Sequence, residues 1–174
     1  MYKPYRKGLG ALDSARWLDE VDWSVLVELQ RDGRASWAEL GRRVRLTPPA
    51  VAERVARLER DGFITGYRAQ IDLAKLGRPT LALLRIRVGG DRRLDRVRTL
   101  FGQLPQVLEC HRVTGEDCYV LKVAIADTAE LEHLVDQLLT VGDPISSIVM
   151  SSLITDVDIA APTPPAAPRR RRIT

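Results

Sequence analysis

The sequence of residues 19–66 is DEVDWSVLVELQRDGRASWAELGRRVRLTPPAVAERVARLERDGFITG. After Thr47, a helical wheel of roughly 100° per residue gathers Val51, Val55 and Leu58 on one side. The opposite side carries Pro49, Glu53, Ala56, Arg57 and Arg60, with Ala50 and Arg54 at its flanks, so small residues lie near the N-terminus and arginines further along. One apolar face and one basic face are typical of a helix that packs on a protein core and enters the major groove of DNA.

Capping residues divide this stretch into three short helices. Asp19, with Asp22 three residues later, is placed to cap the first helix. Ser36 is placed to cap the second helix, and Thr47 the third, whose first residue is a proline. Three helices in so short a stretch predict a helix-turn-helix. Residues 63–67 predict the strand and tight turn of a wing.

The remaining chain has a different pattern. A connecting strand is expected near residues 68–73. The elements expected after it are strands at 81–88, 107–113, 119–126 and 145–154, with helices at 94–104 and after a cap at Thr128. The order β-α-β-β-α-β predicts a ferredoxin-like sandwich, so the fold class is α+β.

Composition shifts divide the chain further. The expected parts are a basic flexible arm at 1–17, a winged helix-turn-helix domain at 18–67, a linker strand and hinge at 68–79, a ferredoxin-like domain at 80–159 and a disordered Pro/Arg tail at 160–174.

The charge of one segment, rather than the net charge of the chain, supports a polyanionic partner. The formal net charge is only +4, and its excess lies at the two ends of the chain. Residues 42–60, however, hold six arginines against two glutamates, on the element expected to face DNA.

Several functional classes are disfavoured. The sequence has no apolar run of ~18–20 residues, no signal-like N-terminus, and two cysteines only, so we expect a reduced, cytoplasmic protein with no membrane contact. Cys110 and His111 are adjacent on a strand and point to opposite faces, which disfavours a shared metal site. No catalytic motif is present, so neither an enzyme nor a cofactor is expected.

Three segments carry a resemblance to a known family. LDEVDWSVLVELQRDGR (18–34), LTPPAVAERVARLERDGFITGY (46–67) and ECHRVTGEDCYVLKV (109–123) resemble the first helix, the recognition helix with its wing, and the central hairpin of the Lrp/AsnC (feast/famine) transcription regulators. The likeness covers roughly residues 18–155. It implies a C-terminal domain of the RAM type, which binds effectors and joins subunits.

The sequence departs from the family pattern at three places. Arg45 stands where the family favours glycine in the turn. Cys118 occupies the second acidic position of the hairpin motif, which helps to hold the ammonium of an amino acid in responsive members. Arg112 stands where the leucine-responsive protein has an apolar residue. An amino-acid effector is therefore implied by the family and weakened by the sequence.

The candidate DNA-binding residues lie on and beside the third helix. We expect the N-terminal half to face base edges: Thr47, Pro48, Pro49, Ala50 and Glu53. Arg57 and Arg60 are placed for phosphates, and Ser36 for the DNA backbone. Arg54 lies partly towards the packed side, so a structural ion pair is an equal alternative to DNA contact.

The candidate effector-binding residues come from two segments, the central hairpin and the last strand. The hairpin contributes Gly115, Glu116, Asp117 and Cys118, although the same residues also suit an ordinary turn. The matching wall is expected from the last strand of a neighbouring subunit: Ser146, Ser147, Ile148 and Val149. The effector would be an amino acid or a related metabolite.

The resemblance also implies the partners. We expect a homodimer that assembles to an octamer and binds a pseudo-palindromic operator in double-stranded DNA. Two alternatives remain open at this point: an architectural, nucleoid-type DNA-binding protein of the same fold, and an enzyme resembling the sirohaem decarboxylases.

Overall fold

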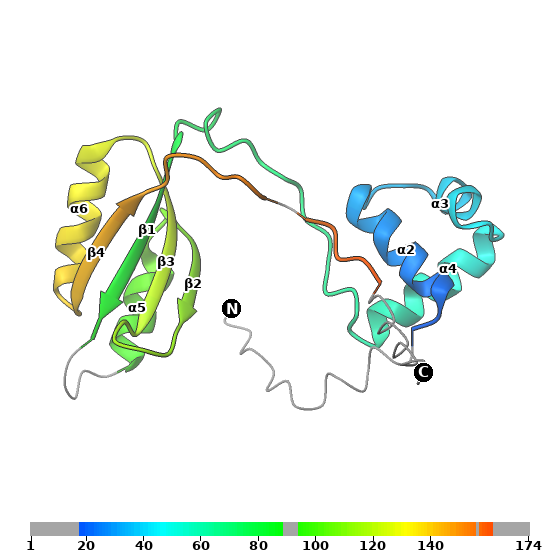
Figure 1. The fold of residues 1–174 in the computed structure, drawn as a ribbon, viewed down its shortest axis with the longest axis horizontal. Helices are drawn as coiled ribbons and strands as arrows, with labels where there is room; N and C mark the ends of the chain where they lie inside the picture. Colours follow the sequence, from blue (N-terminus) through cyan, green and yellow to red (C-terminus); the bar gives the residue numbers. More distant parts are fainter. Residues whose placement is uncertain (1–17, 89–93, 156, 162–174) are drawn as a thin grey trace, which may run out of the picture. The chain divides into compact units, whose positions relative to one another are not determined.

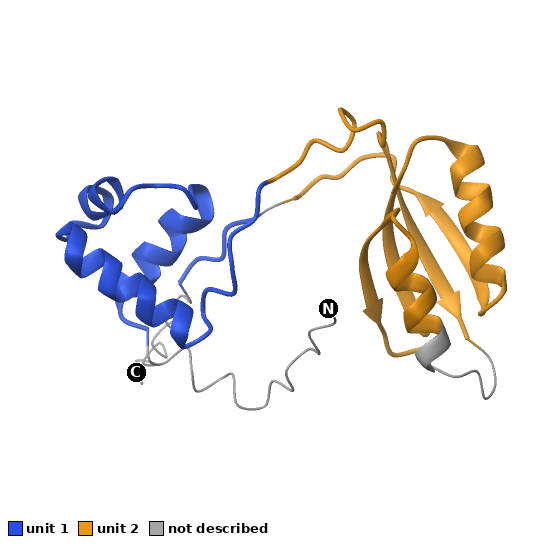
Figure 2. Ribbon diagram, turned by 180° about the vertical axis from the view of Figure 1, so that it is seen from behind, with its two compact units in different colours: residues 1–69, 156–174 blue, residues 70–155 orange. Residues whose placement is uncertain are grey.

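The computed structural model describes residues 18–88, 94–155 and 157–161. Contacts divide the chain into two compact units, unit 1 (residues 1–69 and 156–174) and unit 2 (residues 70–155) (Figure 2). The expected arm at 1–17 and residues 162–174 of the expected tail lie outside the described residues. None of the described helices is long and apolar enough to cross a membrane.

Unit 1 contains the three expected helices, α2 (Glu20–Arg31), α3 (Trp37–Val44) and α4 (Pro48–Arg60) (Figure 1). Asp19 and Asp22 form a complete capping box at the start of α2, and the Ser36 hydroxyl accepts from the Glu39 N–H at the start of α3. Each helix contributes apolar side chains to one shared core: Val25, Leu29, Leu40, Val51, Val55 and Leu58.

The turn between α3 and α4 is tight and strained. Arg45 adopts the left-handed conformation, with φ 58° and ψ 44°. The Leu46 N–H donates to the Gly41 carbonyl at 2.9 Å, and a Cβ on Gly41 would lie 2.5 Å from the Leu46 carbonyl oxygen. The turn therefore needs a glycine at 41, and it tolerates a side chain at 45 only at an energetic cost.

We expect Arg45→Gly to raise the free energy of unfolding of unit 1 by about 0.5–1 kcal/mol. The left-handed conformation costs a residue with a Cβ roughly 1–2 kcal/mol, and the larger entropy loss of glycine offsets part of the gain. Chemical denaturation followed by circular dichroism measures the change. Arg45→Ala keeps the Cβ while removing the charge, so an equal gain in that variant would contradict the explanation.

The strands expected at 63–67 and 68–73 do not form, and these predictions are wrong for the described chain. Residues 64–72 have no regular structure, although Phe63 and Ile64 pack against the core of unit 1 and both donate their N–H to the Leu58 carbonyl. A strand requires a hydrogen-bonded partner, and the described residues of this chain supply none here.

Unit 2 contains the expected sandwich. Its elements are β1 (Thr80–Arg87), α5 (Leu94–Gln103), β2 (Val107–Arg112), β3 (Tyr119–Ile125), α6 (Thr128–Leu139) and β4 (Asp143–Ile148). The four strands form one antiparallel sheet in the order β2-β3-β1-β4 (Figure 1). The predicted ferredoxin-like topology and the α+β class are therefore confirmed.

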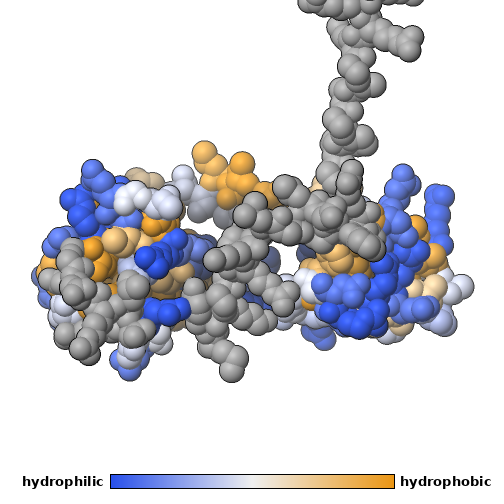
Figure 3. All heavy atoms as spheres, turned by 90° about the horizontal axis from the view of Figure 1, so that it is seen from below, coloured by the Kyte–Doolittle hydropathy of each residue, from blue (hydrophilic) through white to orange (hydrophobic). Residues whose placement is uncertain are grey.

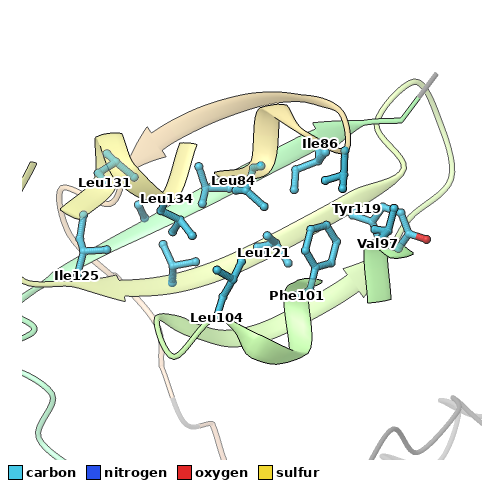
Figure 4. Close-up of a cluster of buried hydrophobic side chains, with 14 residues drawn as sticks. Leu84, Ile86, Val97, Phe101, Leu104, Tyr119, Leu121, Ile125, Leu131 and Leu134 are labelled. Carbon is cyan, nitrogen blue, oxygen red and sulfur yellow. The ribbon is translucent and has the colours of Figure 1, made fainter. Parts of the chain in front are cut away.

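The core of unit 2 lies between one face of the sheet and the two helices (Figure 4). Phe101 of α5 meets Tyr119 of β3 edge to face, with ring centroids 5.4 Å apart. The strands supply Leu84, Ile86, Leu121 and Ile125 to the same cluster.

Two boundaries differ from expectation. Asp127, and not Thr128, caps α6, because its carboxylate accepts from the Glu130 N–H at 2.9 Å. β4 begins at Asp143 and ends at Ile148 instead of residue 154. Its partner β1 begins at Thr80, so the pairing of the two strands ends there. The Val149 N–H still donates to the Leu81 carbonyl just beyond β4.

Candidate functional site

Helix α4 has two faces of different character. Val51, Val55 and Leu58 are buried in the core of unit 1. The opposite face exposes Thr47, Pro48, Pro49, Glu53 and Arg60, with Ala50 half-buried beside them. Thr47 caps the helix through its extended backbone, but its hydroxyl makes no capping hydrogen bond. The residues proposed for base contact therefore share one accessible end of one helix.

The exposed face of α4 borders a concavity of about 660 Å³. Its lining comes from α4, the preceding turn and the start of α2: Asp19, Leu46, Ala50, Glu53, Arg54, Ala56, Arg57 and Arg60. The small side chains of Ala50 and Ala56 leave room for another molecule next to the arginines.

A buried carboxylate holds two of those arginines. The side chain of Asp22 is 1% exposed, and its Oδ1 accepts from Arg54 Nη1 at 2.7 Å and from Arg57 Nη2 at 2.6 Å. Its Oδ2 accepts from the Asp19 N–H at 3.2 Å. Both carboxylate oxygens are thus used within unit 1, as a buried charge requires.

Asp19 closes the cluster at the surface. Its Oδ2 lies 2.7 Å from Arg54 Nη1, so Arg54 contacts two carboxylates at once. Burial raises the pKa of Asp19, but the hydrogen bonds from the Asp22 N–H and from Arg54 outweigh it and the pKa is lowered. Hydrogen bonds to Asp19 and Asp22 raise the pKa of Arg54. Arg54 therefore forms a structural ion pair, which its position on the helical wheel had left as an alternative to DNA contact.

Arg60 is placed differently from the other two arginines of α4. Its side chain is 70% exposed, and its ion-pair contact with Asp61 spans 3.7 Å. Such an exposed contact contributes little and breaks easily in favour of a phosphate. Ser36 stands at the entry to α3, where its hydroxyl oxygen already serves as the helix cap.

The hairpin between β2 and β3 lies beside the end of β1. Gly115 has a positive φ of 112°, which a glycine tolerates. Glu116 pairs with Arg87 at 2.8 Å, and Asp117 lies 3.5 Å from Arg85. The half-buried Cys118 directs its Sγ at the Val88 carbonyl, 3.6 Å away. Both acidic residues of the hairpin therefore face arginines of β1.

The second group of candidate effector residues lies further along the sheet. Ser147 pairs with Leu83, and the Val149 N–H donates to Leu81, whereas the Cys118 N–H donates to Ile86. The segment from Ser146 through Ile148 to Val149 thus runs away from the hairpin towards the opposite end of β1. One chain does not bring the two groups into one cavity.

Metal ligation finds no support in the described part of the chain. No group of three His, Cys, Asp or Glu side chains there could hold an ion. His111 instead contacts Glu109 at 3.1 Å, and Glu109 also accepts from Lys122 at 3.1 Å.

Sequence reasoning missed the central role of Asp22. It identified Asp22 only as a companion of the Asp19 cap. Asp22, Val25 and Leu29 are spaced three and four residues apart, so the sequence does place this carboxylate on the buried face of α2. A buried acid on an apolar face needs a cationic partner, and that was the available signal.

Two domain models match most of the chain. Residues 18–59 match the AsnC-type helix-turn-helix domain, and residues 81–159 match the Lrp/AsnC ligand binding domain. Residues 1–17 and 160–174 lie outside both matches.

Curated relatives cover the same region. The chain is 36% identical over 142 residues to the leucine-responsive regulatory protein of Escherichia coli K12, covering 78% of this chain and 87% of that protein. It is 31% identical over 138 residues to the transcriptional regulator LrpC of Bacillus subtilis, covering 79% of this chain and 95% of the relative.

Solved structures share the fold. LrpC of B. subtilis superposes with a TM-score of 0.76 at 31% identity, covering 79% of this chain and 98% of that one. The feast or famine regulatory protein of Mycobacterium tuberculosis, complexed with L-methionine, gives 0.75 at 32% identity, covering 83% and 99%. A regulator of Neisseria meningitidis, also in complex with L-methionine, gives 0.76 at 29% identity, covering 82% and 96%.

Proposed function

Because the chain belongs to the Lrp/AsnC family of transcriptional regulators, and is therefore a regulator with a DNA-binding and a ligand-binding domain and not an enzyme, we propose that α4 reads the major groove of an operator. The observation that carries this proposal is the exposed face of α4, small at its N-terminal end and basic at its C-terminal end. Thr47, Pro48, Pro49, Ala50 and Glu53 then face base edges, while Arg57 and Arg60 contact phosphates.

The three arginines of α4 have different tasks in this proposal. Asp22 orients Arg54 and Arg57, and their remaining N–H groups reach the DNA from fixed positions. Arg60 binds a phosphate as a mobile, exposed side chain. Ser36 contacts the DNA backbone with its hydroxyl hydrogen while its oxygen keeps the helix cap.

We expect Arg60→Ala to weaken DNA binding by about tenfold and to reduce the slope of log affinity against log salt by about 0.9, the value for one phosphate. Fluorescence anisotropy over a salt series measures both quantities. Lys75→Ala also removes an exposed cation, from the linker in unit 2, and serves as the matched control. If the two variants behave alike, Arg60 acts only through the net charge.

The decisive experiment compares the DNA upstream of the protein's own gene with a scrambled duplex. A preference of ~10³-fold or more supports a specific regulator. Equal, steeply salt-dependent binding to both duplexes supports the architectural alternative. Absence of binding to either duplex contradicts the proposed role of α4.

We propose further that two copies associate through the open face of the sheet in unit 2. The register places Leu83 beside Ser147 and Arg85 beside Ile145 on that face, and Leu83 and Ile145 are 40% and 45% exposed. Apolar side chains are among the residues at the surface in Figure 3. A homodimer presents two α4 helices to successive major grooves of a pseudo-palindromic operator, and further assembly to an octamer follows the family pattern.

An amino acid is the proposed effector, and the Arg85–Asp117 pair is its proposed contact. A guanidinium beside a carboxylate is complementary to the carboxylate and ammonium of a zwitterion. The 3.5 Å separation of the pair is long for a hydrogen bond, so a ligand displaces little. Ser146, Ser147, Ile148 and Val149 of a neighbouring copy supply the second wall, since one chain holds them away from the hairpin.

L-methionine, which is bound in two of the similar structures, is the first ligand to test. In isothermal titration calorimetry we expect Asp117→Asn to weaken its binding at least tenfold, because the ammonium loses its counter-charge. Glu116→Gln is the matched control, and little change is expected because that side chain is 85% exposed. Equal losses in both variants would place the ammonium elsewhere.

A further inference from the structure

The described arginines of unit 1 fall into two groups. One group is ion-paired with carboxylates: Arg31, Arg43, Arg54, Arg57 and Arg60. The other group is exposed and has no carboxylate partner among the described residues: Arg34, Arg42, Arg45 and Arg68. Exposed arginines are ordinary on a protein surface, so the backbone and the position of each one decide what it can bind.

Arg45 differs from the other unpaired arginines in its backbone. It is the one residue other than glycine with a positive φ in residues 18–88, 94–155 and 157–161. The turn between α3 and α4 holds it there, because the Arg45 N–H and the Leu46 N–H both donate to the Gly41 carbonyl (Figure 1). Glycine would adopt this conformation without the cost of a side chain. Backbone strain of this kind is concentrated at functional sites, so the Arg45 side chain needs a function to explain it.

The position of Arg45 is next to the end of α4 that is proposed to enter the major groove. Arg45 precedes the Thr47 cap by two residues, so their Cα atoms are at most about 7.6 Å apart. Leu46, between them, lines the concavity along the exposed face of α4. The major groove is about 12 Å wide, so its phosphate walls lie roughly 6 Å from a helix end at its centre. A long cationic side chain on this turn can therefore contact a phosphate.

The nearby Arg43 has a different role. It contacts Glu28 at 3.4 Å and Asp32 at 3.7 Å, so its guanidinium is held against the acidic residues at the end of α2. A second role for Arg45 would be to interact with the dipole of α3, whose C-terminal end it caps. Arg42 and Arg43 already place two cations in the last turn of that helix. The dipole therefore does not explain a third cation at a strained position.

We propose that Arg45 binds a phosphate at the edge of the major groove that α4 enters. The proposal rests on the proposed function, because it requires α4 to lie in the groove. The guanidinium presents paired N–H donors to phosphate oxygens, and no carboxylate of the described chain competes for them. A phosphate contact fixes the register of the protein on DNA and carries no base preference. The same side chain thus destabilises the free turn and strengthens the complex with DNA.

Three substitutions at residue 45 separate charge from backbone conformation. Fluorescence anisotropy follows their binding to the DNA upstream of the protein's own gene and to a scrambled duplex, over a salt series. Arg45→Gly and Arg45→Ala should each bind about tenfold more weakly to both duplexes, with a salt slope lower by about 0.9. Arg45→Lys keeps the charge, so it should keep the wild-type slope. The glycine variant should therefore be more stable than the wild type and bind DNA more weakly.

Lys75→Ala is the control for net charge, because it removes an exposed cation of unit 2. An unchanged salt slope in Arg45→Gly, or an equal loss in Lys75→Ala, would overturn the proposal. A loss in Arg45→Gly alone, with Arg45→Ala binding as the wild type does, would assign the effect to the turn and would also overturn it. Failure of the proposed function is a separate result, because Ala50→Glu on α4 would then bind as strongly as the wild type.

Discussion

Asp22→Ala is expected to lower the free energy of unfolding of unit 1 by about 2–4 kcal/mol. Removing one partner of a buried ion pair costs roughly 3–5 kcal/mol, and the partial exposure of Arg54 and Arg57, 29% and 35%, places the loss towards the lower end. A small unit has a total stability of only a few kcal/mol, so much of it would be lost. Urea denaturation followed by tryptophan fluorescence measures the change.

Asp22→Asn is the matched control for this prediction. It keeps the volume of the side chain and an acceptor for the Asp19 N–H, but it removes the charge that two guanidinium groups share. The free energy of unfolding of this variant should lie between those of the wild type and the alanine variant. If Asp22→Ala unfolds at the wild-type urea concentration, the ion cluster does not stabilise unit 1.

The cluster also limits the use of Arg57 as a probe of DNA contact. Arg57→Ala removes a partner of Asp22 together with any phosphate contact, so weaker DNA binding by that variant has two explanations. The exposed Arg60 and the small Ala50 test the recognition face without disturbing the buried carboxylate.

Ala50→Glu is expected to lower operator affinity about 100-fold while unit 1 stays at least as stable as the wild type. Residue 50 is the third residue of α4 after the Thr47 cap, so a glutamate there faces the positive end of the helix dipole and can accept from the Thr47 backbone N–H. The same carboxylate faces the DNA, where repulsion by phosphates costs several kcal/mol. Thermal unfolding and anisotropy measure the two effects separately.

Ala50→Gln separates charge from bulk. Glutamine has the size of glutamate but no charge, so its smaller loss of affinity should reflect steric effects alone. Operator binding by Ala50→Glu at wild-type strength would show that α4 does not face the DNA.

Local signals predicted most of the fold. The caps at Asp19 and Ser36 and the proline after Thr47 located three helices, and alternating polarity located the strands of unit 2. These signals are reliable because a capping bond or a strand's two-residue period depends on residues that are close in sequence. The strands predicted at 63–73 do not form, because a strand depends on a partner and residues 18–88, 94–155 and 157–161 provide none there.

The sequence by itself determined the family, the order of the elements and the face of α4 that stays exposed, since all of these follow from motif, period and capping. Only the tertiary structure decided which arginines of that face contact a buried carboxylate. Arg54 and Arg57 meet Asp22 across 32 and 35 residues because α2 and α4 pack together, whereas Arg60, a few positions on, contacts the exposed Asp61 at 3.7 Å. Packing brings distant charges into contact, and a helical period alone does not specify that contact.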